Sequence, residues 1–96
     1  MTSEQKRELK SELRYVGRRR LIVQEQIKIR SDELERLEHE ASRLIQVYYT
    51  TGDQKVYTMF GRIDQLYREI QQLVMDELSL NFRIQVIEDK ISCLWA

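Results

Sequence analysis

A heptad repeat of apolar residues runs through most of the chain and restricts its fold more than any other feature. In the first half, spacings of four and three residues alternate, and ten of the twelve positions are apolar. Such a repeat places its side chains along one stripe of an α-helix, as in a coiled coil. We therefore predict one long helix over residues 3–49, with Thr2 and Gln5 forming a capping box at its start. The twelve positions are Leu9, Leu13, Val16, Arg20, Val23, Ile27, Arg30, Leu34, Leu37, Ala41, Leu44 and Tyr48.

The second half continues the repeat after a turn signal, Thr51-Gly52-Asp53. Two such stripes joined by a short turn predict an antiparallel helical hairpin. The expected fold is all-α: one domain over residues 1–96, with a helix at 3–49, a connection at 50–55 and a helix at 56–95. The stretch at 55–60 is rich in β-formers and precedes Gly61, so a short β-hairpin at residues 54–64 is the alternative there. The second stripe comprises Val56, Met59, Ile63, Leu66, Ile70, Leu73, Glu77, Leu80, Ile84, Ile87, Ile91 and Leu94.

Composition argues against several other classes of protein. The chain has no proline and only three glycines, so a β-sandwich or barrel, which needs many turns, is not expected. Its apolar runs, such as Leu21-Ile22-Val23, reach four residues at most and are too short for a membrane span. Lys and Arg balance Asp and Glu at 16 each, which disfavours a nucleic-acid binder. A basic stripe, Lys6-Lys10-Arg14-Arg18, is interleaved with glutamates and fits a solvated helix surface or a contact for an acidic partner.

Residues that could carry chemistry are scarce. His39 is the only histidine and Cys93 the only cysteine, so we expect no metal site and no catalytic pair. We likewise expect no cofactor and no small-molecule substrate. A single cysteine cannot form an internal disulfide, which favours a reducing, cytoplasmic location.

A second set of apolar residues lies off the main stripes, toward the open end of the predicted hairpin. A helix that is apolar on several sides must bury more than one of them. One interpretation is that a second copy covers these residues in a four-helix bundle; the other is that they bind partner or unfolded client proteins. The candidate interface residues are Tyr15, Ile22, Ile29, Met75, Leu78, Phe82 and Val86.

Three charged residues interrupt the stripes: Arg20, Arg30 and Glu77. If the chain folds back at residue 52, Glu77 lies near Ile27 and within reach of Arg30. A polar layer of this kind would set the register of the helices and the choice of partner. The alternative is a buried site in which Arg20 and Arg30 hold a dicarboxylate, as in a small helical enzyme.

Residues 53–70 resemble the β-class subunits of prefoldin. The resemblance lies in an acidic turn residue, Val-Tyr, and then Gly-Arg before a new helix, read here from Asp53 to Ile63 and continuing to Arg68-Glu69-Ile70. It implies a β-hairpin between two coiled-coil helices, a β-barrel platform that joins subunits, and client binding without nucleotide near the free helix ends. The assembly residues that it implies are Val56, Tyr57, Met59, Phe60, Gly61, Arg62 and Ile63.

Three functions therefore stay open at this point. The first is a prefoldin-like subunit, an ATP-independent holdase chaperone within a hetero-oligomer. The second is a helical-hairpin adaptor that dimerises as a four-helix bundle, and the third is a small helical enzyme. A strand at residues 54–64 would favour the first, a continuous helix there the second, and binding of a dicarboxylate the third.

Overall fold

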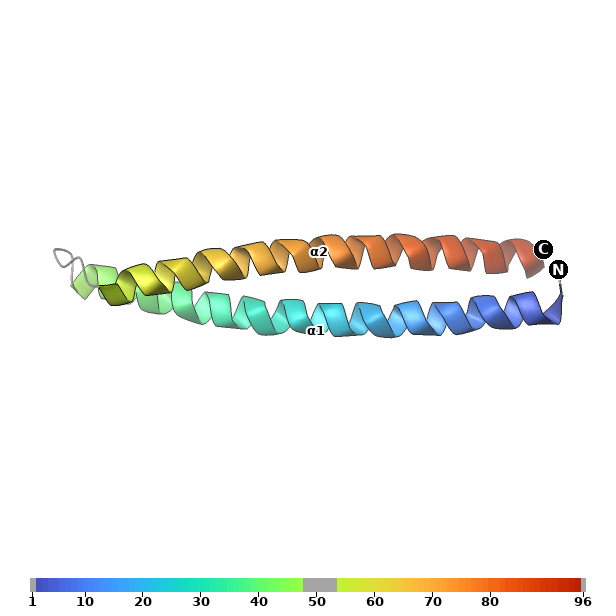
Figure 1. Ribbon diagram of the computed structural model, residues 1–96, viewed down its shortest axis with the longest axis horizontal. Coiled ribbons are helices and arrows are strands. Elements are labelled where there is room, and N and C mark those ends of the chain that lie inside the picture. The colour runs from blue at the N-terminus through green and yellow to red at the C-terminus, as the bar shows by residue number, and fades with distance from the viewer. Residues whose placement is uncertain (1, 48–53, 96) are drawn as a thin grey trace.

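Two long antiparallel helices form the whole of the described fold (Figure 1). The structure is a computed structural model and describes residues 2–47 and 54–95. Helix α1 spans Ser3–Val47 and helix α2 spans Gln54–Trp95. The molecule measures 71 × 16 × 14 Å, and both termini lie at the same end. The predicted all-α helical hairpin is therefore confirmed.

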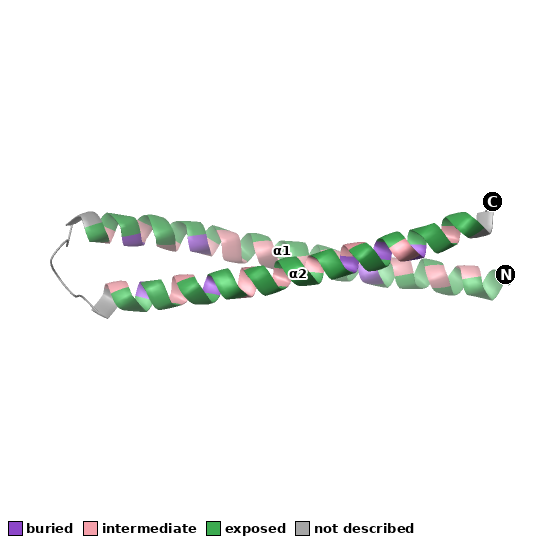
Figure 2. Ribbon diagram, turned by 90° about the horizontal axis from the view of Figure 1, so that it is seen from above, coloured by how far each residue is buried: buried purple, intermediate pink, exposed green. Residues whose placement is uncertain are grey.

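The heptad stripes supply the core. The eight buried hydrophobic residues all come from the two stripes, and the helices cross near their middle as they wind around each other (Figure 2). Every other stripe position whose burial is described is at least half-buried, including the charged ones. Two helices can bury only the stripe that each turns toward the other, so the remaining surface depends on solvent or on a partner. The buried residues are Val16, Leu34, Ala41, Met59, Leu66, Leu80, Ile84 and Ile87.

Residues 54–64 are helical, so the alternative of a β-hairpin in this segment is wrong. Helix α2 begins two residues before the expected start at 56. The heptad explains the outcome: Met59 is buried and Val56 and Ile63 are half-buried against α1, which a helix achieves and an alternating strand does not. Tertiary burial thus outweighs the local β-propensity of this stretch. The predicted turn at 51–53, with Tyr48 and Tyr49, lies outside the described residues.

The capping box at the start of α1 is confirmed. The backbone N–H of Gln5 donates to the Thr2 hydroxyl oxygen at 3.3 Å, and the backbone N–H of Thr2 donates to Gln5 Oε1 at 3.1 Å. These two bonds satisfy backbone donors that have no partner inside the helix. Helix α1 then runs through Gly17 and Ser31 as one helix.

Gly61 offers a direct test of the helical assignment. It is exposed, its φ is not positive, and an added Cβ would meet no atom within 4 Å. Because glycine loses more backbone entropy than alanine in a helix, Gly61→Ala should stabilise the protein by roughly 0.5–1 kcal/mol. Urea unfolding followed by circular dichroism at 222 nm would measure this.

Gly61→Pro is the matched control, since proline inside a helix costs about 3 kcal/mol. A loss of stability in Gly61→Ala would instead indicate a glycine-specific turn at this position and contradict the continuous helix.

Candidate interaction surfaces

The two sides of the hairpin beside the core differ in chemistry. With the stripe positions lettered a and d, Leu13 and Val56 are a residues, and the neighbouring positions are e and g. In an antiparallel pair, g positions meet g positions on one side and e positions meet e positions on the other. We call these sides the g flank (positions g and c) and the e flank (positions e and b).

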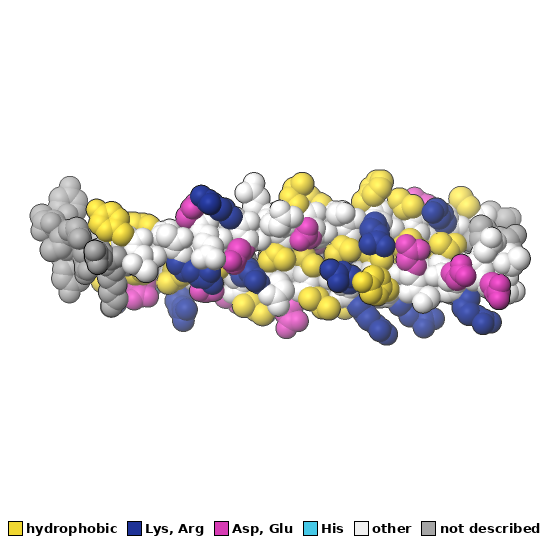
Figure 3. Space-filling view, viewed as in Figure 1, with side chains coloured by type: hydrophobic (Ala, Val, Ile, Leu, Met, Phe, Trp, Pro, Cys, Tyr) yellow, Lys and Arg dark blue, Asp and Glu magenta, His cyan; other side chains and the backbone are white. Residues whose placement is uncertain are grey.

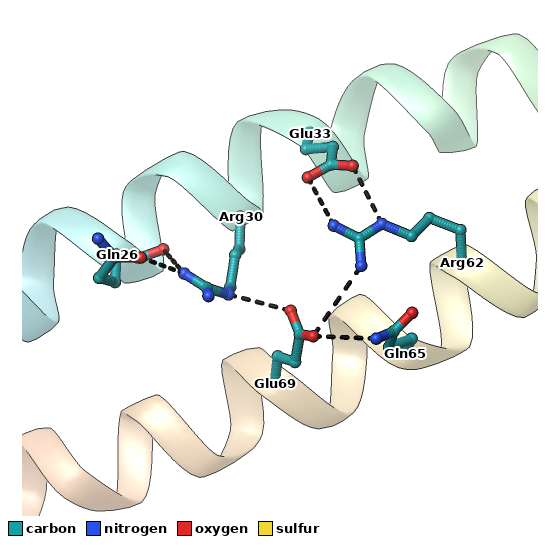
Figure 4. A network of polar contacts seen from close by, with 6 residues as sticks. All are labelled: Gln26, Arg30, Glu33, Arg62, Gln65 and Glu69. Atoms are coloured by element: carbon teal, nitrogen blue, oxygen red, sulfur yellow. Dashed lines mark hydrogen bonds and ion pairs between the residues drawn. The ribbon is translucent and has the colours of Figure 1, made fainter.

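The g flank is closed by ion pairs between the helices. Arg62 forms a two-bond contact with Glu33, with Nε–Oε1 and Nη2–Oε2 both at 3.1 Å. Arg30 Nε lies 3.0 Å from Glu69 Oε2, and Arg62 Nη1 lies 3.9 Å from Glu69 Oε1. Figure 4 shows these four side chains as one network, which Gln65 extends through a 3.2 Å bond to Glu69. Charged side chains of both helices thus satisfy one another here.

The same contacts shift two pKa values. The hydrogen bond from Arg62 lowers the pKa of the Glu33 carboxyl, and the charges of Arg62, Arg36 and Arg30 act in the same direction against partial desolvation. The bond to Glu33 raises the pKa of Arg62. Nearer the open end, Arg83 Nη2 lies 3.6 Å from Glu12 Oε1, so the g flank is charged along much of its length.

The three charged stripe residues do not form one layer. Arg30 pairs with Glu69 and donates to Gln26, not to Glu77, so the expected Arg30–Glu77 approach is wrong. A fold-back centred on residue 52 places residue 74 level with Arg30, whereas the observed partner is Glu69, so that expectation misplaces α2 by about five residues, or somewhat more than one helical turn. Glu77 is half-buried.

Arg20 finds a partner that the heptad analysis missed. Its Nη1 donates to Asn81 Oδ1 at 3.2 Å, while its Nε is buried without a hydrogen-bond partner. Arg20 and Arg30 therefore contact different residues of α2, more than two turns apart along α1.

The e flank carries most of the exposed apolar surface. It holds seven of the twelve large hydrophobic residues that are exposed among the described side chains: Leu21, Ile45, Tyr57, Phe60, Tyr67, Val74 and Leu78. A shallow groove on this flank is lined by Ile45, Phe60 and Tyr67 with their neighbours. Its polar contact is the bond from the Tyr67 hydroxyl to Glu38 Oε1 at 2.6 Å, which raises the pKa of Tyr67.

The seven candidate interface residues point in several directions. Tyr15, Ile22 and Ile29 are exposed at c positions of α1, on the g side. Met75 and Phe82 are exposed at f positions, on the back of α2, where hydrophobic side chains line its outer edge in Figure 3. The remaining two also separate: Leu78 is exposed on the e flank, and Val86 is half-buried. The structure therefore confirms that most are exposed but does not bring them into one surface.

The residues implied by the prefoldin resemblance are divided in the same way. Met59 is buried and Val56 and Ile63 are half-buried in the helical core. Tyr57, Phe60 and Gly61 are exposed, and the half-buried Arg62 belongs to the g-flank network. The burial of these seven residues thus follows their positions around helix α2 and not the alternating sides of a β-strand.

Sequence reasoning missed Leu21, Val74, Tyr67 and Ile45, although each was visible as an apolar residue beside a stripe position. Their common signal is the e or b position, which only becomes a shared surface once the pairing of the two helices is known. The sequence predicts the second apolar set toward the open end, but exposed apolar residues also lie nearer the turn: Ile45, Tyr57, Phe60 and Tyr67.

Other kinds of site find little support in the described residues. Among residues 2–47 and 54–95, no group of three or more His, Cys, Asp or Glu side chains could hold a metal ion. Neither described helix is long and apolar enough to cross a membrane. His39 lines an open depression with Asp32, Glu35 and Arg36 on the surface of α1.

The Glu33–Arg62 contact predicts a pH dependence. The pKa of Glu33 is lowered in the folded state, so the contact stabilises the fold above the usual glutamate pKa, and this contribution is lost as the pH falls through the lowered value. In Arg62→Gln, the Glu33 carboxyl should titrate closer to its usual pKa. Carboxyl-carbon NMR titration of both proteins would measure the difference, and equal Glu33 pKa values in the two would contradict the ion pair.

Comparison with known proteins gave no match to a family model, a curated protein or a solved structure, so the function is argued from the geometry of the hairpin.

Proposed function

We propose that the chain is a helical-hairpin interaction protein that pairs with a second copy of itself to form a four-helix bundle. The observation that carries this proposal is the imbalance of its apolar residues: twelve large hydrophobic side chains are exposed among the described residues, and eight hydrophobic residues are buried. Seven of the twelve lie on the e flank. A second hairpin laid on that flank would convert a two-helix layer into a two-layer bundle.

The energetics support a partner of this kind. Burying a large apolar side chain gains about 1.5–3 kcal/mol, so leaving seven of them in water on one flank forgoes a substantial stabilisation. The g flank leaves three large apolar side chains exposed, Tyr15, Ile22 and Ile29, and its charged groups already pair across the helices, so it gains less from such a partner. Helix α2 is also continuous through residues 54–64, which supports an uninterrupted hairpin that packs along its length.

A prefoldin-like holdase is the second candidate, and a different observation favours it. Phe82 is 71% exposed and Met75 is 59% exposed, and both project from the back of α2, away from the e flank. A dimer formed through the e flank would leave them available for unfolded clients. The prefoldin resemblance implies a β-hairpin at residues 54–64 that joins subunits, but this segment is helical here. The four-helix bundle is therefore the leading proposal. A cytoplasmic location belongs to both proposals.

Light scattering of the purified chain over a range of concentrations tests the leading proposal. We expect a mass of twice 11.7 kDa, falling toward 11.7 kDa on dilution. Leu78→Ser should weaken the dimer on the order of a hundredfold, because the twofold symmetry removes a leucine from the interface twice.

Phe82→Ser is the matched control: it removes a still more exposed residue from the other side of the same helix and should leave the mass unchanged. The holdase proposal makes a separate prediction for the same variant: Phe82→Ser should weaken the suppression of client aggregation. A chain that stays at 11.7 kDa throughout would overturn the self-pairing proposal.

A further inference from the structure

The two helices contribute very different charge to the e flank. On α1, the e flank carries a basic group near the start of the helix, made of the exposed residues Arg7, Lys10 and Arg14. It carries an acidic group in the later half, made of the exposed residues Glu35 and Glu38, and Lys28 lies between the two groups. On α2, the e and b positions from residue 57 to 92 hold two charged residues, Asp64 and Glu88. The e flank is therefore bipolar along α1, whereas α2 contributes only two widely separated acidic residues to it.

This difference discriminates between the two ways in which a second copy can cover the flank. If the twofold axis runs parallel to the long axis, both pairs of termini lie together and α1 packs on α2 of the second copy. Given the register set by the Arg30–Glu69 pair, Glu35 then lies at the level of Asp64, and Arg14 at the level of Gln85. Like charges meet at one end, and the basic group finds one acidic residue, Glu88, at the other.

If the axis is perpendicular to the long axis, the copies lie head to tail and α1 packs on α1. The exposed apolar residues Leu21, Val74 and Leu78 lie at nearly one level of the hairpin, so an axis through them places each trio on its counterpart. About that axis Arg7 comes opposite Glu38 of the second copy, and the basic group as a whole meets the acidic group. The flank of α2 meets itself, and its two acidic residues, Asp64 and Glu88, come opposite each other as a like-charge contact of this arrangement.

We propose that the hairpin dimerises head to tail through its e flank, α1 on α1 and α2 on α2, about a twofold axis at Leu21, Val74 and Leu78. This inference depends on the proposed self-pairing and adds its partner orientation. Charge complementarity along α1 selects the orientation, and the apolar trio sets the centre of the interface.

The single cysteine provides the test. Cys93 is exposed and can carry a nitroxide spin label on the full-length chain without a substitution. It lies about 17 residues from the proposed axis, so the two labels of a head-to-tail dimer should be about 50 Å apart. With the termini together they would lie within about 25 Å, since a four-helix bundle is only two helices wide. Pulsed dipolar EPR spectroscopy separates these distances.

A second label position provides the matched control. Gly61→Cys in a Cys93→Ser background places the label near the other end of α2, where an added Cβ meets no atom. Alone it should give about 45 Å in the head-to-tail dimer. Mixed with protein labelled at Cys93, it should also give a short distance, within about 25 Å, because the two sites then lie at one level.

Each outcome decides a separate question. A dimer with distant Cys93 labels and a short mixed distance supports the proposal. A dimer with close Cys93 labels keeps the proposed self-pairing and overturns the orientation. A chain with no dipolar coupling and a mass of 11.7 kDa overturns both.

Charge reversal tests the electrostatic reason independently. Arg14→Glu should weaken the head-to-tail dimer several-fold, because a basic residue of the e flank becomes acidic opposite the acidic half of the second copy. Arg18→Glu is the control, since Arg18 is equally exposed but lies at an f position, on the back of α1. Equal dissociation constants for the two variants would overturn the role assigned to the e-flank charges.

Discussion

The structure depends on the burial of one apolar stripe of each helix against the other. Helices of 45 and 42 residues would not hold their length alone in water, because propensity contributes little compared with packing along an amphipathic surface. The same constraint limits what the chain can bury. A pair of helices encloses only its a and d positions, so every apolar side chain elsewhere stays exposed until another surface covers it.

The g flank and the e flank, which lie outside that buried stripe, differ in the side chains they expose. On the g flank, charged residues of both helices pair, and surface pairs of this kind give geometry and specificity more than stability. On the e flank, aromatic and aliphatic side chains are left in water, with Tyr67 satisfying its hydroxyl on Glu38. In Figure 3, Lys and Arg also gather along the outer edge of the N-terminal part of α1, opposite the apolar edge of α2. The distribution of charged and apolar side chains therefore differs between the sides of the hairpin as well as along its length.

Sequence reasoning reached the fold because the repeat is long and regular. Every described stripe position, from Leu9 to Ile91, is buried or half-buried as the heptad predicts, and the Thr2–Gln5 capping box forms. It left an alternative open where local and tertiary preferences compete, at 54–64, whose β-forming residues are helical because Met59 must reach the core. It also misplaced Glu77 relative to Arg30, because the fold-back was centred on residue 52, and the heptad repeat alone does not state where along their length the two helices meet. The candidate interface was recognised as exposed apolar surface, but its division among three directions required the pairing.

That ambiguity gives the Arg30–Glu69–Arg62–Glu33 network a mechanical meaning. A slide of one helix along the other by one heptad, about 10 Å, would return apolar residues to apolar positions at little cost. The charged residues do not repeat in this way: a slide in either direction separates Arg62 from Glu33 and Arg30 from Glu69, and replaces these pairs by a mixture of like contacts, such as Glu69 opposite Glu33, and unlike contacts, such as Arg62 opposite Glu40. A pull along the long axis would therefore have to break these ion pairs before the stripes could pack again one heptad further on, so the network ties the hairpin to one register.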